Sequence, residues 1–284
     1  MELSLCSYSF HRLLEAGQQD VFKYISDCRA LGCTQLDLWN GHLPSLRDDE
    51  ARPEGPSSFT LEYTQLSPAE VDYIARIKAA ADTAGLPFGC LAVDGTHIYE
   101  ASPEARRANQ IKAHRWLNIA EQLSAQQIRI DSGGPPEMPD DVLDIIVTGY
   151  NDLIQRAGEK GIEVVMENHW GASRIPENVV RILEAVPGLG LLFDTGNWPD
   201  EMRETGWTQC ARYARATHLK TFAFDTEGNE TTVDIPRAMR ILQEAGYEGS
   251  WGIESCPRQG DEYEAAKKSI ALVRHVLGAT AASP

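Results

Sequence analysis

The sequence has no excess of positive charge and no long apolar run. Its 26 Lys and Arg residues are outnumbered by 42 Asp and Glu residues, for a formal net charge of -16. A surface this acidic repels phosphate backbones and anionic lipid, so we expect neither nucleic-acid nor membrane partners. No stretch approaches the roughly 20 apolar residues that span a bilayer, and no basic segment with an apolar run behind it follows Met1. We therefore expect a cytoplasmic protein.

Paired cysteines are also missing. The 6 cysteines are scattered, none forms a Cys-x-x-Cys pair, and several lie inside apolar runs that are typical of strands. This distribution favours buried, reduced thiols, which suits the cytoplasm.

What the sequence does contain is a repeated pattern, in which short apolar runs alternate with longer amphipathic segments. The runs are apolar nearly throughout, as is typical of parallel strands covered on both faces. We expect strands at 3–7, 34–38, 88–93, 127–131, 163–167, 190–194, 216–221 and 250–254. Apolar residues three and four apart predict helices at 71–84, 104–123, 142–157, 176–185, 235–245 and 263–277.

Eight strands that alternate with helices fit a closed barrel or a doubly wound open sheet. The count of eight favours the barrel, and so does the residue run 10–12, Phe-His-Arg, where an open sheet would carry a glycine-rich nucleotide loop. We predict a single α/β domain over residues 1–277, a (β/α)8 TIM barrel, followed by a flexible tail at 278–284. The polar segment at about 41–66 is too long for a plain loop, and it is either a lid or a tolerated surface insertion.

Side chains that can bind a metal stand in the last four expected strands. Glu167, Asp194 and Glu254 end the fifth, sixth and eighth, and His218 lies in the seventh. These strand ends are neighbours on one half of a barrel rim, so the side chains can converge. Taken singly, Asp194 could cap a helix and His218 could be a core histidine. Three carboxylates in a small space need a cation to stay ionised, so the set of four favours a divalent-metal site.

Oxygen ligands with one imidazole suit Mn²⁺, Mg²⁺ or Co²⁺, and suit Zn²⁺ less clearly. We expect Mn²⁺, with the other three ions as alternatives.

At these positions the sequence resembles the sugar phosphate isomerase/epimerase family, the xylose isomerase-like TIM barrels. The resemblance rests on Glu167 in ENH, Asp194 in FDTGN, His218 in THLK and Glu254 in GIES, and it covers essentially the whole chain. It implies that these four residues are the metal ligands. The ketose 3-epimerases of this group further imply that Glu167 and Glu254 exchange protons with the substrate carbon.

Two positions depart from those epimerases. Asn197 stands where they typically carry a histidine, and the run 220–224, KTFAF, has no counterpart of their substrate-binding arginine. The resemblance therefore does not extend to ketohexose specificity.

Six residues are candidates for substrate binding: Trp39, Asp131, His169, Asn197, Lys220 and Arg258. His169 follows Glu167 by two residues, so strand alternation can bring both to one side, where His169 either contacts substrate or positions a ligand. Lys220 stands in the same relation to His218, and it binds a substrate oxygen or pairs with a carboxylate. Arg258 follows the eighth strand, where barrels often bind phosphate. Trp39 is a candidate wall for a sugar or a structural tryptophan.

These residues predict an enzyme, a divalent-metal-dependent isomerase or epimerase acting on a keto-sugar or sugar derivative through a metal-stabilised enolate, with two glutamates as acid and base. The alternative is a metal-dependent lyase or dehydratase on an oxidised (3-keto) sugar or glycoside. An AP-endonuclease-type nuclease is less favoured because it needs more histidine ligands and a basic groove. A non-catalytic sugar-binding barrel is also less favoured. The expected partner is a small-molecule carbohydrate, and a homo-oligomer is left open.

Overall fold

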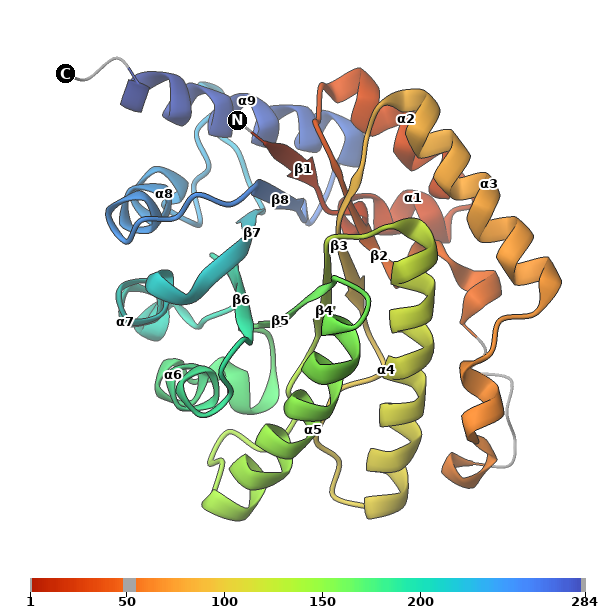
Figure 1. Cartoon of the computed structure of the whole chain (residues 1–284). Helices are drawn as coiled ribbons and strands as arrows, with labels where there is room; N and C mark the ends of the chain where they lie inside the picture. The colour runs from red at the N-terminus through yellow and green to blue at the C-terminus, as the bar shows by residue number, and fades with distance from the viewer. Residues whose placement is uncertain (1, 48–54, 282–284) are drawn as a thin grey trace.

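Eight parallel strands form the centre of the molecule. The computed structural model describes residues 2–47 and 55–281 of the chain, and the strands lie in the order β1-β8-β7-β6-β5-β4-β3-β2. A parallel backbone bridge between Cys6 and Asp37 connects β1 to β2, so the sheet closes. Helices surround it on the outside (Figure 1). The predicted single (β/α)8 TIM barrel is therefore confirmed.

Every expected strand is present in the structure. The bounds are β1 (Leu3–Leu5), β2 (Leu36–Trp39), β3 (Phe88–Val93), β4 (Gln127–Ile130), β5 (Glu163–Glu167), β6 (Gly190–Asp194), β7 (Ala214–Thr221) and β8 (Trp251–Ser255). Nearly all of their side chains are buried, because the helices cover one face of the sheet and the barrel interior encloses the other.

The expected helices are also present, and three more accompany them. The bounds are α1 (His11–Glu15), α2 (Val21–Leu31), α3 (Pro68–Ala84), α4 (Pro103–Leu123), α5 (Asp140–Gly158), α6 (Pro176–Ala185), α7 (Asp200–Cys210), α8 (Ile235–Glu244) and α9 (Glu262–Ala281). Helices α1, α2 and α7 have no counterpart among the helices predicted from the sequence. The sequence contains a clear signal for α2, namely a capping residue, Asp20, before it and a glycine, Gly32, after it. In the structure Asp20 accepts from the backbone N of Lys23, and Gly32 ends the helix with a φ of 76°. Helix α7 is polar on most sides, so its pattern is weak.

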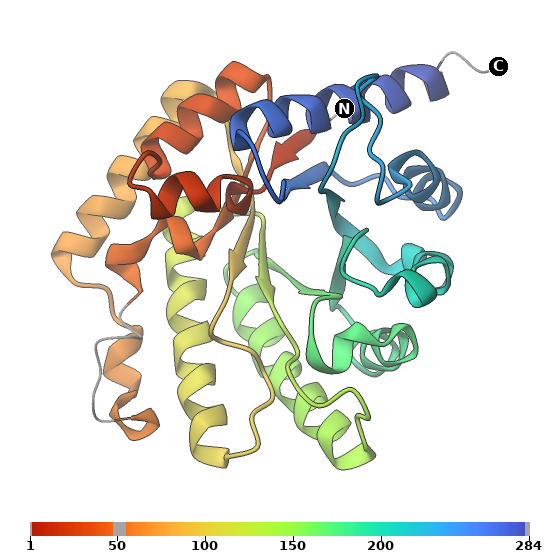
Figure 2. The ribbon, with the colours of Figure 1, turned by 180° about the vertical axis from the view of Figure 1, so that it is seen from behind.

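The last helix lies beside the first ones, which completes the ring of helices. Figure 2 shows α9 next to α1 and α2, seen from behind. Glu262 at the start of α9 accepts from Arg12 Nε at 3.0 Å, and Arg274 donates to the carbonyl of Gly32 at 2.8 Å. Helix α9 continues to Ala281, four residues into the expected tail. Residues 282–284 lie outside the described part of the chain.

Residues 55–66, in the long segment after β2, are attached to the outside of the barrel at α4. Phe59 and Tyr63 pack on Ala108 and Ile111 of α4, and Arg115 donates to the carbonyl of Tyr63 at 3.0 Å. Figure 1 shows this segment on the side of α4 that faces away from the strands. Residues 55–66 therefore pack against α4, whereas residues 48–54 lie outside the described chain.

No helix among the described residues combines the length and the hydropathy needed to cross a bilayer.

Candidate metal centre

The candidate site has an apolar floor inside the barrel. Cys90, Val165, Leu192 and Ala216 form a buried cluster across β3, β5, β6 and β7. Residues two positions further along a strand point to the same side, so three of the expected ligands stand directly above this cluster. The sheet register agrees, since Asp194 pairs with His218 and Lys220 pairs with Glu254 in neighbouring strands. Glu167 pairs with Leu192 instead, so the candidate ligands lie at staggered register positions, and Glu167, Asp194 and His218 nevertheless come within 4.8 Å of one another.

Glu167, at the end of β5, is held on both of its carboxylate oxygens. Its Oε1 accepts from Asn197 Nδ2 at 3.0 Å, and its Oε2 lies 3.1 Å from Arg129 Nε. Burial alone would raise its pKa, but Arg129, His169 and His218 together hold the pKa of Glu167 well below its usual range. Glu167 is therefore a fixed, ionised carboxylate at neutral pH.

Asp194, at the end of β6, has one oxygen engaged by the chain and one oriented toward the site. Its Oδ1 accepts from the backbone N of Gly196 at 2.7 Å and of Asn197 at 2.8 Å. Its Oδ2 lies 3.3 Å from Lys220 Nζ. Burial raises the pKa of Asp194 to about 6, against the opposing effect of Lys220. Asp194 therefore caps the following turn through Oδ1, as one of its two possible roles predicts, and Oδ2 is the oxygen that can bind a metal ion.

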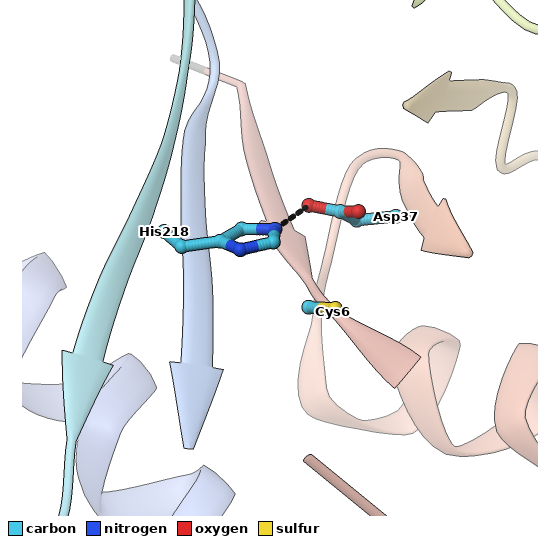
Figure 3. Close-up of side chains that lie close together, drawn as sticks. All are labelled: Cys6, Asp37 and His218. Atoms are coloured by element: carbon cyan, nitrogen blue, oxygen red, sulfur yellow. Dashed lines mark hydrogen bonds and ion pairs between the residues drawn. The ribbon is translucent and has the colours of Figure 1, made fainter. Parts of the chain in front are cut away.

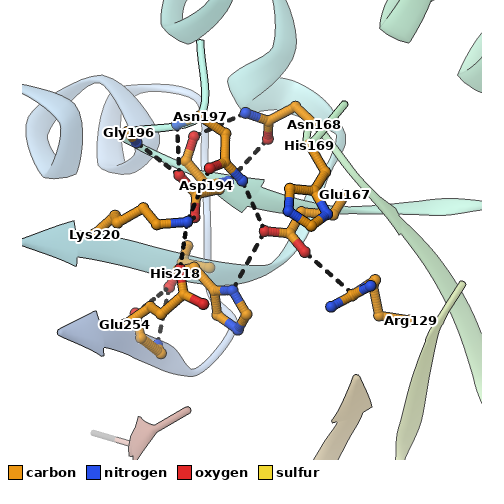
Figure 4. A network of polar contacts seen from close by, with 12 residues as sticks. Arg129, Glu167, Asn168, His169, Asp194, Gly196, Asn197, His218, Lys220 and Glu254 are labelled. Carbon is orange, nitrogen blue, oxygen red and sulfur yellow. Dashed lines mark hydrogen bonds and ion pairs between the residues drawn. The ribbon is translucent and has the colours of Figure 1, made fainter. Parts of the chain in front are cut away.

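His218, in β7, is oriented by a carboxylate behind it. Its Nε2 lies 3.2 Å from Asp37 Oδ2, while its Nδ1 lies 3.5 Å from Glu167 Oε1 (Figures 3 and 4). A bond from Nε2 to a carboxylate leaves Nδ1 as the nitrogen that can bind a metal. Room for Asp37 comes from Gly252, since a Cβ there would lie 3.3 Å from Asp37 Oδ2 and 2.1 Å from the carbonyl oxygen of Thr217.

Glu254, in β8, joins the site through a lysine. Lys220 Nζ lies 2.6 Å from Glu254 Oε2 and donates to Asn197 Oδ1 at 2.8 Å (Figure 4). Burial opposes ionisation of Glu254, but Lys220 and His218 keep its pKa below the usual value. The expected pairing of Lys220 with a carboxylate is therefore present, and Asn197 connects it to Glu167.

A second group of charges adjoins Glu167. Arg129, in β4, lies 3.0 Å from Asp131 Oδ2 and 2.8 Å from Asp94 Oδ1. His169 Nδ1 lies 3.0 Å from the same Asp131 oxygen. Burial would lower the pKa of His169, but Glu167 and Asp131 raise it to about 9. His169 is therefore a cation at neutral pH, and its partly exposed ring can donate to a substrate oxygen.

The donor set fits a divalent cation. Glu167, Asp194 and His218 each offer an atom within 4.8 Å of the others. Three buried atoms of the candidate ligands, Asp194 Oδ2, His218 Nδ1 and Glu254 Oε2, make no hydrogen bond of ordinary geometry among the described residues, although Lys220 Nζ lies beside the two carboxylate oxygens and Glu167 Oε1 lies 3.5 Å from the imidazole nitrogen. Buried polar atoms are rarely left in this state, and carboxylate oxygens with one imidazole nitrogen are ligands for Mn²⁺ or Mg²⁺.

Two other groups of ligand-type residues are less suitable. Cys6, Asp37 and His218 lie together, but burial raises the pKa of the Cys6 thiol to about 12, so it stays protonated and binds metal poorly. Asp131, Glu167 and His169 also lie together, but this group already contains two positive charges, Arg129 and the cationic His169, which oppose a metal ion.

Two of the expected substrate residues lie further out. Trp39 Nε1 donates to Asp94 Oδ2 at 2.7 Å, and its ring meets Tyr8 edge to face at 5.0 Å between centroids. Trp39 is thereby fixed beside the charged group around Arg129. Arg258 does not join the network, since it is exposed and lines a separate cavity of about 540 Å³ with Phe222 and Lys268.

Sequence reasoning missed Arg129 and the role of Asp37. A signal existed for Arg129, because a charged residue inside the apolar run 127–131 must find a partner when it is buried. Asp37 stands in a buried strand in the same way. Asn168 was also missed, and its side chain bonds both the backbone N and the carbonyl of Asp194 at 2.9 Å.

Comparison with known proteins identifies the family of this chain. The sequence profile of the xylose isomerase-like TIM barrel matches residues 26–276. The chain belongs to this family. No curated protein matches the sequence.

Solved structures of this kind share the fold at low identity. D-psicose 3-epimerase from Clostridium cellulolyticum H10, solved with D-tagatose, has a TM-score of 0.71 and 13% identity, covering 98% of this chain and 99% of its own. The probable 3-DHS dehydratase of petrobactin synthesis from Bacillus anthracis has a TM-score of 0.68 and 13% identity, covering 96% and 99%. A xylose isomerase-like protein from Mycobacterium smegmatis, in complex with magnesium, has a TM-score of 0.67 and 16% identity, covering 98% and 97%.

Proposed function

We propose that this family member is a divalent-metal-dependent isomerase or epimerase of a keto-sugar or sugar derivative. The observation that carries the proposal is the convergence of Glu167, Asp194 and His218, with ligand atoms within 4.8 Å of one another and Glu254 beside them across Lys220. The proposal is supported by the fold shared with a D-psicose 3-epimerase and with a protein solved with magnesium. Mn²⁺ is the ion we expect.

Glu167, Asp194, His218 and Glu254 would hold the ion. When bound, it would act as a Lewis acid that stabilises negative charge developing on the substrate. Asp37 would keep His218 in the orientation that presents Nδ1, and the backbone of Gly196 and Asn197 would keep Asp194 Oδ1 occupied so that Oδ2 faces the site.

Glu167 and Glu254 would exchange the proton. Both have lowered pKa values and are ionised at neutral pH, which is the form that accepts a proton, and the cations that lower the pKa values also make the carboxylates weaker bases. Arg129 and Asn197 fix the orientation of Glu167, which favours a base that always approaches from one side. Return of the proton to the opposite face gives an epimer, and return to the adjacent carbon gives an aldose–ketose isomer.

A lyase or dehydratase is the second candidate, and two departures from the epimerase pattern favour it. Asn197 and the run after His218 differ from the ketose 3-epimerases, and a probable dehydratase shares the fold. The same proton abstraction, followed by departure of a group on the next carbon, would give elimination.

The test is deuterium incorporation. Mn²⁺-loaded protein is incubated in D₂O with ketoses, ketose phosphates and 3-keto-glycosides, and the products are read by NMR and mass spectrometry. We expect deuterium at carbon with the skeleton intact, and loss of this exchange in Glu167→Gln and Glu254→Gln. Glu163→Gln is the matched control, because Glu163 lies in the same strand as Glu167 but at its opposite end.

Loss of a group from the substrate would select the lyase instead. Exchange that persists in Glu167→Gln and Glu254→Gln would contradict the assignment of both glutamates.

A further inference from the structure

Lys220 occupies the space between two of the proposed metal ligands. Its Nζ lies 2.6 Å from Glu254 Oε2, 3.3 Å from Asp194 Oδ2 and 2.8 Å from Asn197 Oδ1 (Figure 4). The Lys220 side chain is only 12% exposed and the Asp194 side chain is fully buried. A cation is therefore already present where the carboxylates converge, and the chain itself supplies it.

The neighbours of Lys220 are arranged to accept it. A Cβ at Gly196 would lie 3.1 Å from Lys220 Cβ and 3.2 Å from its Cδ, so the glycine leaves room for the lysine stem. Asn197 presents its amide oxygen to Nζ while its amide nitrogen donates to Glu167 Oε1. The backbone N of Lys220 donates to Thr195 Oγ1 at 2.8 Å. The turn at 195–197 therefore positions Lys220 as well as Asp194.

An ammonium and a divalent ion that share Asp194 Oδ2 and Glu254 Oε2 compete for them, because both are cations and Nζ already lies 3.3 Å from the first oxygen and 2.6 Å from the second. A charge of +2 and a charge of +1 a few ångströms apart repel strongly in a buried site, where water screens them little. Asn197 is neutral, so it can keep its bond to Nζ when the ion binds.

We propose that the Lys220 ammonium is the resident counter-ion of the Asp194–Glu254 pair, and that a divalent metal binds by displacing it. The inference rests on the metal site of the proposed function. Lys220 neutralises the buried carboxylates while the metal is absent, and it lowers the affinity of the site for the metal because the two cations compete. After displacement, Nζ keeps Asn197 as its anchor.

Mn²⁺ affinity at one fixed pH tests the competition. Dissociation constants are measured by calorimetry for the wild type, for Lys220→Met and for Lys268→Met. We expect Lys220→Met to bind Mn²⁺ between about tenfold and about a thousandfold more tightly, the range expected when one nearby like charge is removed. Lys268→Met removes the same charge from an exposed position on α9, and we expect it to bind as the wild type does.

Two further measurements cover the case in which Lys220→Met folds poorly. Thermal unfolding should show a metal-free Lys220→Met that melts below the wild type and a larger rise in Tm on adding Mn²⁺. A crystal structure of the Mn²⁺-loaded wild type should place Nζ more than about 4 Å from Glu254 Oε2, beyond ion-pair distance.

The outcomes separate this inference from the metal site itself. Equal Mn²⁺ affinity in wild type and Lys220→Met, or a loaded structure with Nζ still on Glu254, would overturn the displacement and leave the metal site intact. Absence of Mn²⁺ binding in every variant would overturn the proposed metal site, and the displacement with it.

Discussion

Replacing Asp37 by asparagine should weaken Mn²⁺ binding about tenfold. Asp37 Oδ2 accepts from His218 Nε2 at 3.2 Å, and both side chains are buried (Figure 3). Burial would lower the pKa of His218, but Cys6 and Asp37 raise it well above its usual value, so the metal must displace the proton on Nδ1 while Asp37 holds the one on Nε2. Asparagine keeps the shape of the side chain but removes its charge, and its amide can turn an N–H toward Nε2. The imidazole then loses both its orientation and part of its basicity.

The expected size follows from the geometry of this bond. A carboxylate that supports a metal-binding histidine contributes about 10- to 100-fold to metal affinity, which is about 1.4–2.7 kcal/mol. The Nε2–Oδ2 distance is at the long end of the hydrogen-bond range, so the lower figure applies.

The assay is calorimetric titration of metal-free protein with Mn²⁺. Asp94→Asn is the matched control, since Asp94 is an acidic residue near the same site whose carboxylate bonds Trp39 and Arg129 instead of His218. Wild-type affinity in Asp37→Asn, or an equal loss in Asp94→Asn, would refute the reasoning.

Two further predictions concern stability. Arg129→Met should lower the free energy of unfolding by about 3–5 kcal/mol in urea titrations, because it leaves the buried carboxylates of Asp131 and Glu167 without their cation; a loss below about 1 kcal/mol would contradict this. Burial lowers the pKa of His42 to about 4, so the unfolded chain, with a histidine pKa near 6.5, binds this proton first as the pH falls. His42 should therefore cost no stability above about pH 6.5 and about 2 kcal/mol by pH 5. His42→Leu should show a flatter decline between pH 7 and pH 5 than the wild type, and an unchanged slope would argue against this role.

The sequence predicts the fold well because each strand is a short, nearly continuous apolar run. β5 and β6 have the predicted bounds, since each is an uninterrupted apolar run that ends in a carboxylate. Helix α7 was missed because only Gly206, Trp207 and Cys210 are buried, so its apolar stripe is too narrow to show as a period. The attachment of residues 55–66 to α4 depends on a pairing across about 50 positions in sequence, which a local pattern does not contain.

The candidate ligands could also be predicted, but their partners could not. A strand position determines which side a residue faces, so Glu167, Asp194 and His218 were found from their places in successive strands. The strand position does not determine which charged side chain from another strand lies against each ligand. That Arg129 holds Glu167, and that Lys220 holds Glu254, are contacts between strands that only the folded barrel shows.

The most direct measurement is the anomalous-scattering map of a crystal of the Mn²⁺-loaded protein. The account predicts one manganese peak per chain, about 2.0–2.3 Å from atoms of Glu167, Asp194, His218 and Glu254. A structure without a peak at this position, or with the manganese held instead by Cys6, Asp37 and His218, would contradict it.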